Sequence, residues 1–132
     1  MHENFFHNLK VYYEDTDSGG VVYYANYLKF IERARTEMIY ALFGLNHQRL
    51  KEDYDAIFIV RSCNIKYLKS AVFEDKLTVH TEIIKKSAVR LNLLQEVKRK
   101  TELLASADVE LAIVNSKGEI SKLPSIFLEK LR

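Results

Sequence analysis

The residues best placed to do chemistry are two aspartates, Asp15 and Asp17, which are followed closely by Gly19 and Gly20. A carboxylate can attack a carbonyl carbon directly or activate a water molecule to do so. Free N–H groups at the start of a helix can stabilise the negative charge that then grows on the carbonyl oxygen. Aspartates before helices are more often caps or turn residues, so the pair alone leaves a purely structural role open.

A long helix is predicted directly after this segment, over residues 26–43. Apolar side chains recur there at helical spacing, and further apolar residues widen the stripe, so the helix is predicted to be buried. Asn26 is the predicted N-cap, and Gly44 stands where a left-handed C-terminal cap is expected. At this length the helix measures about 27 Å and can cross a small domain.

The rest of the chain alternates apolar and polar residues with period two. Four strands of about ten residues or more are predicted, with turns near 69–70, 86–87, 100–101 and 116–118. Leu9, Val11 and Tyr13 predict a shorter strand before the helix, residues 46–55 a polar connection, and residues 123–131 a short terminal helix. The sheet has one apolar face that only the long helix can cover, so a single α+β domain over 1–132 is predicted, with the sheet wrapped around that helix.

Composition excludes several classes of protein. The net charge of +2 is nearly balanced, which disfavours nucleic-acid binding, and no apolar run is long enough for a membrane span. The N-terminal residues lack the pattern of a signal peptide. Cys63 is the single cysteine, which excludes an internal disulfide and suits a reducing cytoplasm; its position on the apolar phase of a strand predicts a buried, inert thiol.

The segment YYEDTDSGGVVYYANY, residues 12–27, carries the pattern D-x-D-x-x-G-x-V-Y-Y-x-x-Y immediately before the long helix. This run resembles the signature of the 4-hydroxybenzoyl-CoA thioesterase branch of the hotdog superfamily, in particular the bacterial acyl-CoA thioesterases encoded with the Tol-Pal envelope system. The likeness extends through ERARTE, residues 32–37, and VRS, residues 60–62. It implies a hotdog fold, a five-stranded antiparallel sheet wrapped around one long central helix, and hydrolysis of acyl-CoA to a free acid and CoA.

The same resemblance assigns roles to individual residues. Asp17 is implied to be the catalytic carboxylate and the backbone N–H of Tyr24 the main oxyanion donor, whereas Asp15 stays a structural candidate. Some members of the Tol-Pal group carry histidine where this chain has Tyr24, so a mechanism that needs an imidazole there is excluded. The implied CoA-binding residues are Gly20, Arg61, Ser62, Lys85, Lys86, Ser87 and Arg90. A structural ion pair is an equal alternative for Arg61.

The expected partners follow from the same family. The substrate is acyl-CoA, with acyl-carrier protein as an alternative carrier, and self-association as a homodimer or homotetramer in the cytoplasm is implied. No cofactor is expected, and the four histidines lack a metal-ligand spacing. Glu32 and Arg35 are charges on an apolar helix and, with Thr36, are expected to face the site or a partner subunit. Glu32 and Glu37 are the second choice for the catalytic carboxylate, because some hotdog enzymes use a carboxylate on the helix. Two alternatives stay open: a hotdog hydratase or dehydratase, and a non-catalytic module that binds acyl-CoA or acyl-carrier protein.

Overall fold

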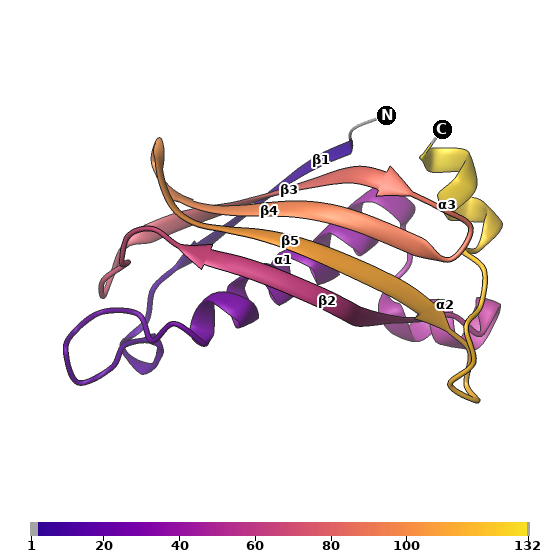
Figure 1. The fold of residues 1–132 in the computed structure, drawn as a ribbon, viewed down its shortest axis with the longest axis horizontal. Coiled ribbons are helices and arrows are strands. Elements are labelled where there is room, and N and C mark those ends of the chain that lie inside the picture. The colour runs from indigo at the N-terminus through magenta and orange to yellow at the C-terminus, as the bar shows by residue number, and fades with distance from the viewer. Residues whose placement is uncertain (1–2, 132) are drawn as a thin grey trace.

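The computed structural model describes residues 3–131 (Figure 1). Its strands and helices follow an α+β order, in which one strand precedes the long helix and four consecutive strands follow it. They are β1 (Glu3–Lys10), the short 3-10 helix η1 (Tyr13–Asp15), α1 (Asn26–Phe43), α2 (His47–Tyr54), β2 (Ile57–Tyr67), β3 (Lys76–Lys86), β4 (Arg90–Arg99), β5 (Glu102–Val114) and α3 (Ser125–Lys130). The long helix and the four long strands confirm the predicted pattern, and α3 confirms the predicted terminal helix.

The five strands form one antiparallel sheet in the order β1-β3-β4-β5-β2. The sheet curves over α1, which lies across its inner face (Figure 1). This arrangement is the hotdog fold, as predicted. Strands β1 and β2 are the two edges, and each has one hydrogen-bonding side without a partner strand among the residues described.

The core forms where α1 meets the sheet. On the helix, Tyr27, Phe30, Ile31, Ala34 and Met38 are buried, and every second residue of β3 and β4 is buried against them. Each fully buried Ile, Leu or Phe side chain contributes about 1.5–3 kcal/mol through the area that it removes from water. The helix is therefore fixed along most of its length, and its two ends are fixed with it.

Of the two caps predicted for α1, the structure confirms the C-terminal one and contradicts the N-terminal one. Gly44 has φ +70° and its N–H donates to the Tyr40 carbonyl at 2.8 Å, so the left-handed C-terminal cap is confirmed. The predicted N-cap is wrong, because Asn26 is already the first helical residue and Ala25 holds the cap position. The Asn26 side chain instead donates from Nδ2 to the Asp15 carbonyl at 2.8 Å, which ties the preceding segment to the helix.

Two further elements differ from the prediction. The connection 46–55 contains α2, which begins after Asn46, whose Oδ1 accepts a hydrogen bond from the Arg49 N–H at 2.8 Å. Leu50 is the only buried residue of this helix, so its apolar periodicity is too weak to read. The first strand lies earlier than predicted, at Glu3–Lys10, and Tyr13 belongs to η1. As an edge strand, β1 only half-buries its inward side chains, so polar residues occupy it and hide its alternation.

The prediction of a buried thiol at Cys63 is wrong. Cys63 is exposed, because α1 does not cover the face of the edge strand β2 as it covers β3 and β4. The register of β2 against β5 also shifts between Val60 and Ser62, which places a bulge at Arg61. Ile59 and Val60 keep 43% and 47% of their surface exposed, so the middle of β2 is an apolar edge.

One buried polar side chain joins α1 to the centre of the sheet. Gln95 on β4 is 0% exposed, and its Nε2 donates to the Ile31 carbonyl and to Thr81 Oγ1, both at 2.9 Å. Its Oε1 accepts from Arg35 Nη1 at 3.1 Å. Two of these hydrogen bonds join Gln95 to α1 and the third joins it to β3, so three of the four that an amide can make tie the helix to the centre of the sheet.

Replacing Gln95 with Leu is expected to lower the free energy of unfolding by about 2–4 kcal/mol. The change leaves the Ile31 carbonyl and the Thr81 hydroxyl oxygen without their donor and the Arg35 guanidinium without its acceptor. Urea denaturation measures this. The matched control is Gln48→Leu, which removes only an exposed bond to Glu52 and is expected to change stability by less than about 0.5 kcal/mol. Equal denaturation midpoints for the two variants would contradict the structural role of Gln95.

Candidate functional site

Asp17 lies in a tight loop between η1 and α1. Its N–H donates to the Val21 carbonyl at 2.8 Å, and its carbonyl accepts from the Gly20 N–H at 3.1 Å. An isolated bridge between Thr16 and Val22 closes the base of the loop. The Asp17 backbone is therefore held on both sides, although the residue itself is exposed.

The Asp17 carboxylate is oriented through one of its oxygens only. Oδ1 accepts from the Gly19 N–H at 2.8 Å and, more weakly, from the Val21 N–H at 3.4 Å. Within residues 3–131, Oδ2 accepts no hydrogen bond. One oxygen thus fixes the side chain, while the other is open to solvent and to a substrate.

The two glycines of the loop are required for different reasons. Gly20 has φ +83°, a conformation that residues with a Cβ rarely adopt. A Cβ built on Gly19 would lie 3.2 Å from Asp17 Oδ1, so any side chain there would crowd the carboxylate. Gly20 was predicted to contact substrate. In the structure its left-handed backbone shapes the loop that carries Asp17.

Asp15 has a structural place. It is 8% exposed, its Oδ2 accepts from the Tyr12 N–H at 2.9 Å, and its carbonyl accepts from the Tyr23 N–H at 3.0 Å as well as from Asn26 Nδ2. These bonds connect η1 to the start of α1. The two aspartates therefore differ in setting, with Asp15 satisfied and buried and Asp17 exposed and half open.

The N-terminus of α1 offers unpaired donors beside this loop. The N–H groups of Asn26, Tyr27 and Leu28 donate to the carbonyls three residues earlier. Those of Tyr24 and Ala25 donate to no acceptor in the part of the chain that the structure describes. The positive end of the helix dipole reinforces them, so this position favours an oxyanion. The Tyr24 ring is 59% exposed and lies against the rings of Tyr23 and Tyr67.

The loop is supported by the connection between β2 and β3. The Val22 N–H donates to the Ala71 carbonyl at 2.8 Å, Val21 bridges Val72, and the Ala71 N–H donates to the Tyr27 hydroxyl at 3.0 Å. The connection thus holds both the loop that carries Asp17 and the first turn of α1.

That connection is itself held by charges that the sequence did not single out for this role. Asp75 Oδ2 accepts from the Val72 N–H at 2.9 Å and from Arg99 Nη1 at 2.7 Å. Arg99 Nη2 also pairs with Glu102 at 2.6 Å, and Lys69 with the same carboxylate at 2.7 Å. These hydrogen bonds from Lys69 and Arg99 lower the pKa of Glu102. Arg99 stands 24 residues from Asp75, so no local pattern indicates the contact.

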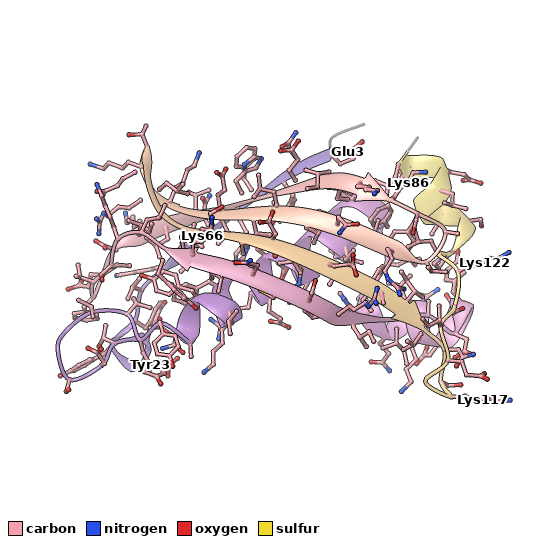
Figure 2. All side chains as sticks on the ribbon, viewed as in Figure 1. Glu3, Tyr23, Lys66, Lys86, Lys117 and Lys122 are labelled. Atoms are coloured by element: carbon pink, nitrogen blue, oxygen red, sulfur yellow. The ribbon has the colours of Figure 1, made fainter. Side chains whose placement is uncertain are left out.

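The basic turn that was predicted to bind CoA lies far from Asp17 of the same chain. Lys85 and Lys86 end β3, and the Ser87 N–H donates to the Arg90 carbonyl at 3.0 Å to close the turn to β4. Figure 2 places Lys86 and Tyr23 at opposite ends of the molecule. The structure therefore brings these four residues together with one another but not with Asp17 of the same chain.

Arg61 and Arg90 converge on one carboxylate. Arg61 Nη1 lies 3.2 Å and Arg90 Nε 3.6 Å from Glu110 Oε1, on neighbouring strands of the sheet. The ion pair weighed as the alternative for Arg61 is thus present, although its exposed side chain makes it worth less than about 1 kcal/mol. Ser62 follows directly after the bulge at Arg61.

A groove separates α1 from the edge strand β2. It contains two cavities of about 420 Å³ and about 400 Å³, which share Glu32, Arg35 and Val60 in their walls. The first cavity extends towards His47 and Phe58, and the second towards the N-terminal turn of α1. Within residues 3–131, no three His, Cys, Asp or Glu side chains gather as a metal site, and no helix is long and apolar enough to cross a membrane.

Known proteins resemble this chain over most of its length. The profile of the thioesterase-like superfamily matches residues 11–131. The chain is 41% identical over 107 residues to the acyl-CoA thioesterase YbgC of Haemophilus influenzae, and the aligned region covers 81% of this chain and 78% of that protein. It is 40% identical over 108 residues to the acyl-CoA thioester hydrolase YbgC of Escherichia coli, with 81% and 79% covered.

Solved structures of thioesterases also match this chain over almost its whole length. A probable thioesterase from Bartonella henselae superposes with a TM-score of 0.86 at 32% identity, over 94% of this chain and all (100%) of that one. A variant of 4-hydroxybenzoyl-CoA thioesterase in complex with 4-hydroxybenzoyl-CoA superposes with a TM-score of 0.90 at 19% identity, over 98% and 99%, which bears on the fold alone. The chain belongs to the thioesterase-like superfamily of hotdog proteins.

Proposed function

We propose that this chain is an acyl-CoA thioesterase that hydrolyses the thioester to a free carboxylic acid and CoA. The observation that carries the proposal is the Asp17 carboxylate, held through Oδ1 by the Gly19 N–H and open at Oδ2, in the loop that leads to the unpaired N–H groups at the start of α1. The relatives named acyl-CoA thioesterases support the same activity.

The chemistry needs only this carboxylate and a backbone donor. Attack of Asp17 Oδ2 on the thioester carbon forms a tetrahedral centre, which collapses by breaking the C–S bond and releasing CoA thiolate. Water then cleaves the mixed anhydride, which releases the acid and restores the carboxylate. Alternatively, Asp17 takes a proton from water and the resulting hydroxide attacks the same carbon. On both routes the Tyr24 N–H stabilises the oxyanion.

A second copy of the chain completes the proposed site. Pairing two β2 edges about a two-fold axis would cover the exposed Ile59 and Val60 and provide hydrogen-bond partners for the edge. Because the strands would run antiparallel, the turn 85–90 of one copy would move towards the Asp17 end of the other. Lys85, Lys86, Ser87 and Arg90 would then hold the CoA phosphates across the interface. A homotetramer, acyl-carrier protein as the carrier and a cytoplasmic location stay predictions.

The test is thiol release from a panel of acyl-CoAs of different chain lengths, followed with a thiol reagent. Turnover of at least one member supports the proposed function. Tight binding of acyl-CoA by calorimetry without any release of thiol would replace it with a binding module. Formation of a hydrated or dehydrated acyl-CoA, detected by mass spectrometry, would instead indicate the other class of hotdog enzyme.

Replacing Arg99 with Met is expected to lower kcat roughly tenfold, about 1.4 kcal/mol, with little change in KM. The reason is positional, since Arg99 holds Asp75, Asp75 holds Val72, and Val72 bridges the loop that carries Asp17. Arg99→Lys should restore part of kcat, which general destabilisation would not explain. Arg49→Met, which breaks the exposed pair with Asp53 on α2, is the control. A kcat for Arg99→Met within twofold of the wild type would contradict the role of this support.

A further inference from the structure

Arg35 is an unusual cation in this fold, because it lies in the groove between α1 and β2 without an acidic partner. The side chain is half-buried, and it donates one hydrogen bond, to the neutral amide of Gln95. In the described residues, 3–131, no carboxylate lies within ion-pair distance of it. Burial lowers the pKa of Arg35, and the nearby charge of Glu32 offsets this only in part.

The surroundings of Arg35 make its unpaired donors costly. The guanidinium stands where the two cavities of the groove meet, and apolar side chains form most of the remaining wall. These are Leu28, Ile31, Ile39, Phe58, Ile59, Val60 and Leu111. A guanidinium has five N–H donors, of which Gln95 takes one. Glu32 lines both cavities and offsets part of the cost of burying this charge, but no hydrogen bond or ion pair joins it to Arg35 among residues 3–131. A ligand that fills the groove and supplies an acceptor would therefore gain a charge-assisted hydrogen bond.

Gln95 keeps this cation at one place. Its amide is fully buried and bound to Ile31 and Thr81, so the Oε1 that accepts from Arg35 cannot turn away. Arg33, two residues earlier on the same helix, is exposed, as is usual for a charge on α1. Two residues correspond to about 200° around the helix, so Arg33 faces solvent whereas Arg35 lies on the side of α1 that borders the groove.

The groove leads from the candidate catalytic end of α1 to Arg35. Eleven residues separate Tyr24 from Arg35, a rise of about 16 Å at helical geometry, and side chains lean back towards the N-terminus, which shortens the distance to be spanned. An acyl chain that starts with its carbonyl at the Tyr24 N–H and follows α1 passes Leu28 and Ile31 before it meets the guanidinium.

On this geometry we propose that Arg35 is a specificity-determining residue, which selects acyl groups that carry an oxygen acceptor, a hydroxyl or a carboxylate, at the end remote from the thioester. The proposal rests on the proposed thioesterase function. A terminal methyl would displace water from the guanidinium and return only about 0.8 kcal/mol per buried methylene. A hydroxyl replaces one of the lost hydrogen bonds, and a carboxylate accepts two in the bidentate geometry that arginine favours. Gln95 is the positioning residue of this contact.

The experiment compares kcat/KM for three acyl-CoAs of equal chain length: hexanoyl-CoA, ω-hydroxyhexanoyl-CoA and adipoyl-CoA. The wild type is expected to prefer at least one of the two oxygen-bearing substrates over hexanoyl-CoA by roughly tenfold, and Arg35→Met to bring that ratio close to one. A larger effect with adipoyl-CoA identifies charge as the selected property, and equal effects identify a neutral acceptor; both support the proposal. Arg33→Met, on the exposed face of α1, should keep the wild-type ratio.

Two outcomes overturn the inference while leaving the thioesterase intact. One is a wild type that hydrolyses hexanoyl-CoA as well as the two oxygen-bearing substrates. The other is an Arg35→Met variant that keeps the wild-type ratio but dissociates into monomers in light-scattering measurements, which would assign the groove to a second copy of the chain. If Arg35→Met fails to fold, Arg35→Lys provides the test. Lysine retains the positive charge but lacks the two parallel N–H donors of the guanidinium, so the ratio of kcat/KM for adipoyl-CoA to that for hexanoyl-CoA should fall.

Failure of the proposed function gives a different result, namely no thiol release from any of the three substrates. The inference is then decided by calorimetry on the same three acyl-CoAs. Tighter binding of adipoyl-CoA or ω-hydroxyhexanoyl-CoA by the wild type, lost in Arg35→Met, supports a polar-ended acyl ligand. Equal affinities for all three overturn it.

Discussion

Asp17→Asn is expected to lower kcat at least a hundredfold, a loss of about 2.7 kcal/mol of transition-state stabilisation. Asparagine has nearly the same size, and its side-chain oxygen can still accept from the Gly19 N–H at the position of Oδ1. The open Oδ2 becomes an amide nitrogen, which can neither attack a thioester nor take a proton from water. Thiol release with the best substrate of the panel measures the effect, and circular dichroism checks that the fold is kept.

The matched control is Glu14→Gln, which neutralises an exposed carboxylate three residues away. It should leave kcat and KM at their wild-type values. If Asp17→Asn retained activity within a fewfold of the wild type, Asp17 would revert to a turn residue whose role is to accept from Gly19. The nucleophilic and general-base routes both make the same prediction, so the experiment tests the carboxylate and not the choice between them.

Tyr24→Pro is the second variant with a large expected effect, a loss of about 10²–10³ in kcat, because removal of one oxyanion donor costs that much in comparable sites. Proline deletes the N–H and leaves the rest of the backbone in place. The fold should tolerate it, since Tyr24 precedes the first helical residue and its N–H has no acceptor within residues 3–131. Single-turnover measurements with saturating enzyme separate this loss from weaker binding.

Tyr24→Phe is the control for the side chain. It retains the N–H and the exposed ring and removes only the hydroxyl, so a backbone role predicts nearly wild-type kcat. A large loss in Tyr24→Phe together with a small one in Tyr24→Pro would transfer the role from the backbone to the phenol. Thermal denaturation of both variants shows whether the start of α1 is preserved.

Local patterns predicted most of the architecture. The helix α1 and the buried faces of β3 and β4 follow from apolar residues at periods of 3.6 and two, because each element buries one face against the other. Gly44 marked the end of α1 for a local reason, its left-handed backbone. The same logic failed where burial is slight: α2 buries only Leu50, β1 is half-buried, and Cys63 lies on an edge strand that the helix does not cover.

The candidate site, too, was predicted from the sequence only in part. Asp17 and the Tyr24 N–H were assigned through the resemblance of a contiguous segment, and the structure places both in the loop and helix start that the segment forms. The basic turn at 85–90 was also read correctly as a turn, yet only the fold shows that it lies at the far end of its own chain (Figure 2).

The sequence by itself determined the long helix, the four long strands and the segment that is the candidate for the chemistry, because those depend on neighbours within a few residues. Tertiary structure alone decided which distant side chains act on that segment. Arg99 reaches Asp75 across 24 residues to support the Asp17 loop, and Gln95 reaches Arg35 across 60 to hold a cation in the groove. No spacing rule connects such pairs, since they meet only after the sheet has closed over α1 and fixed which side chains share its interior.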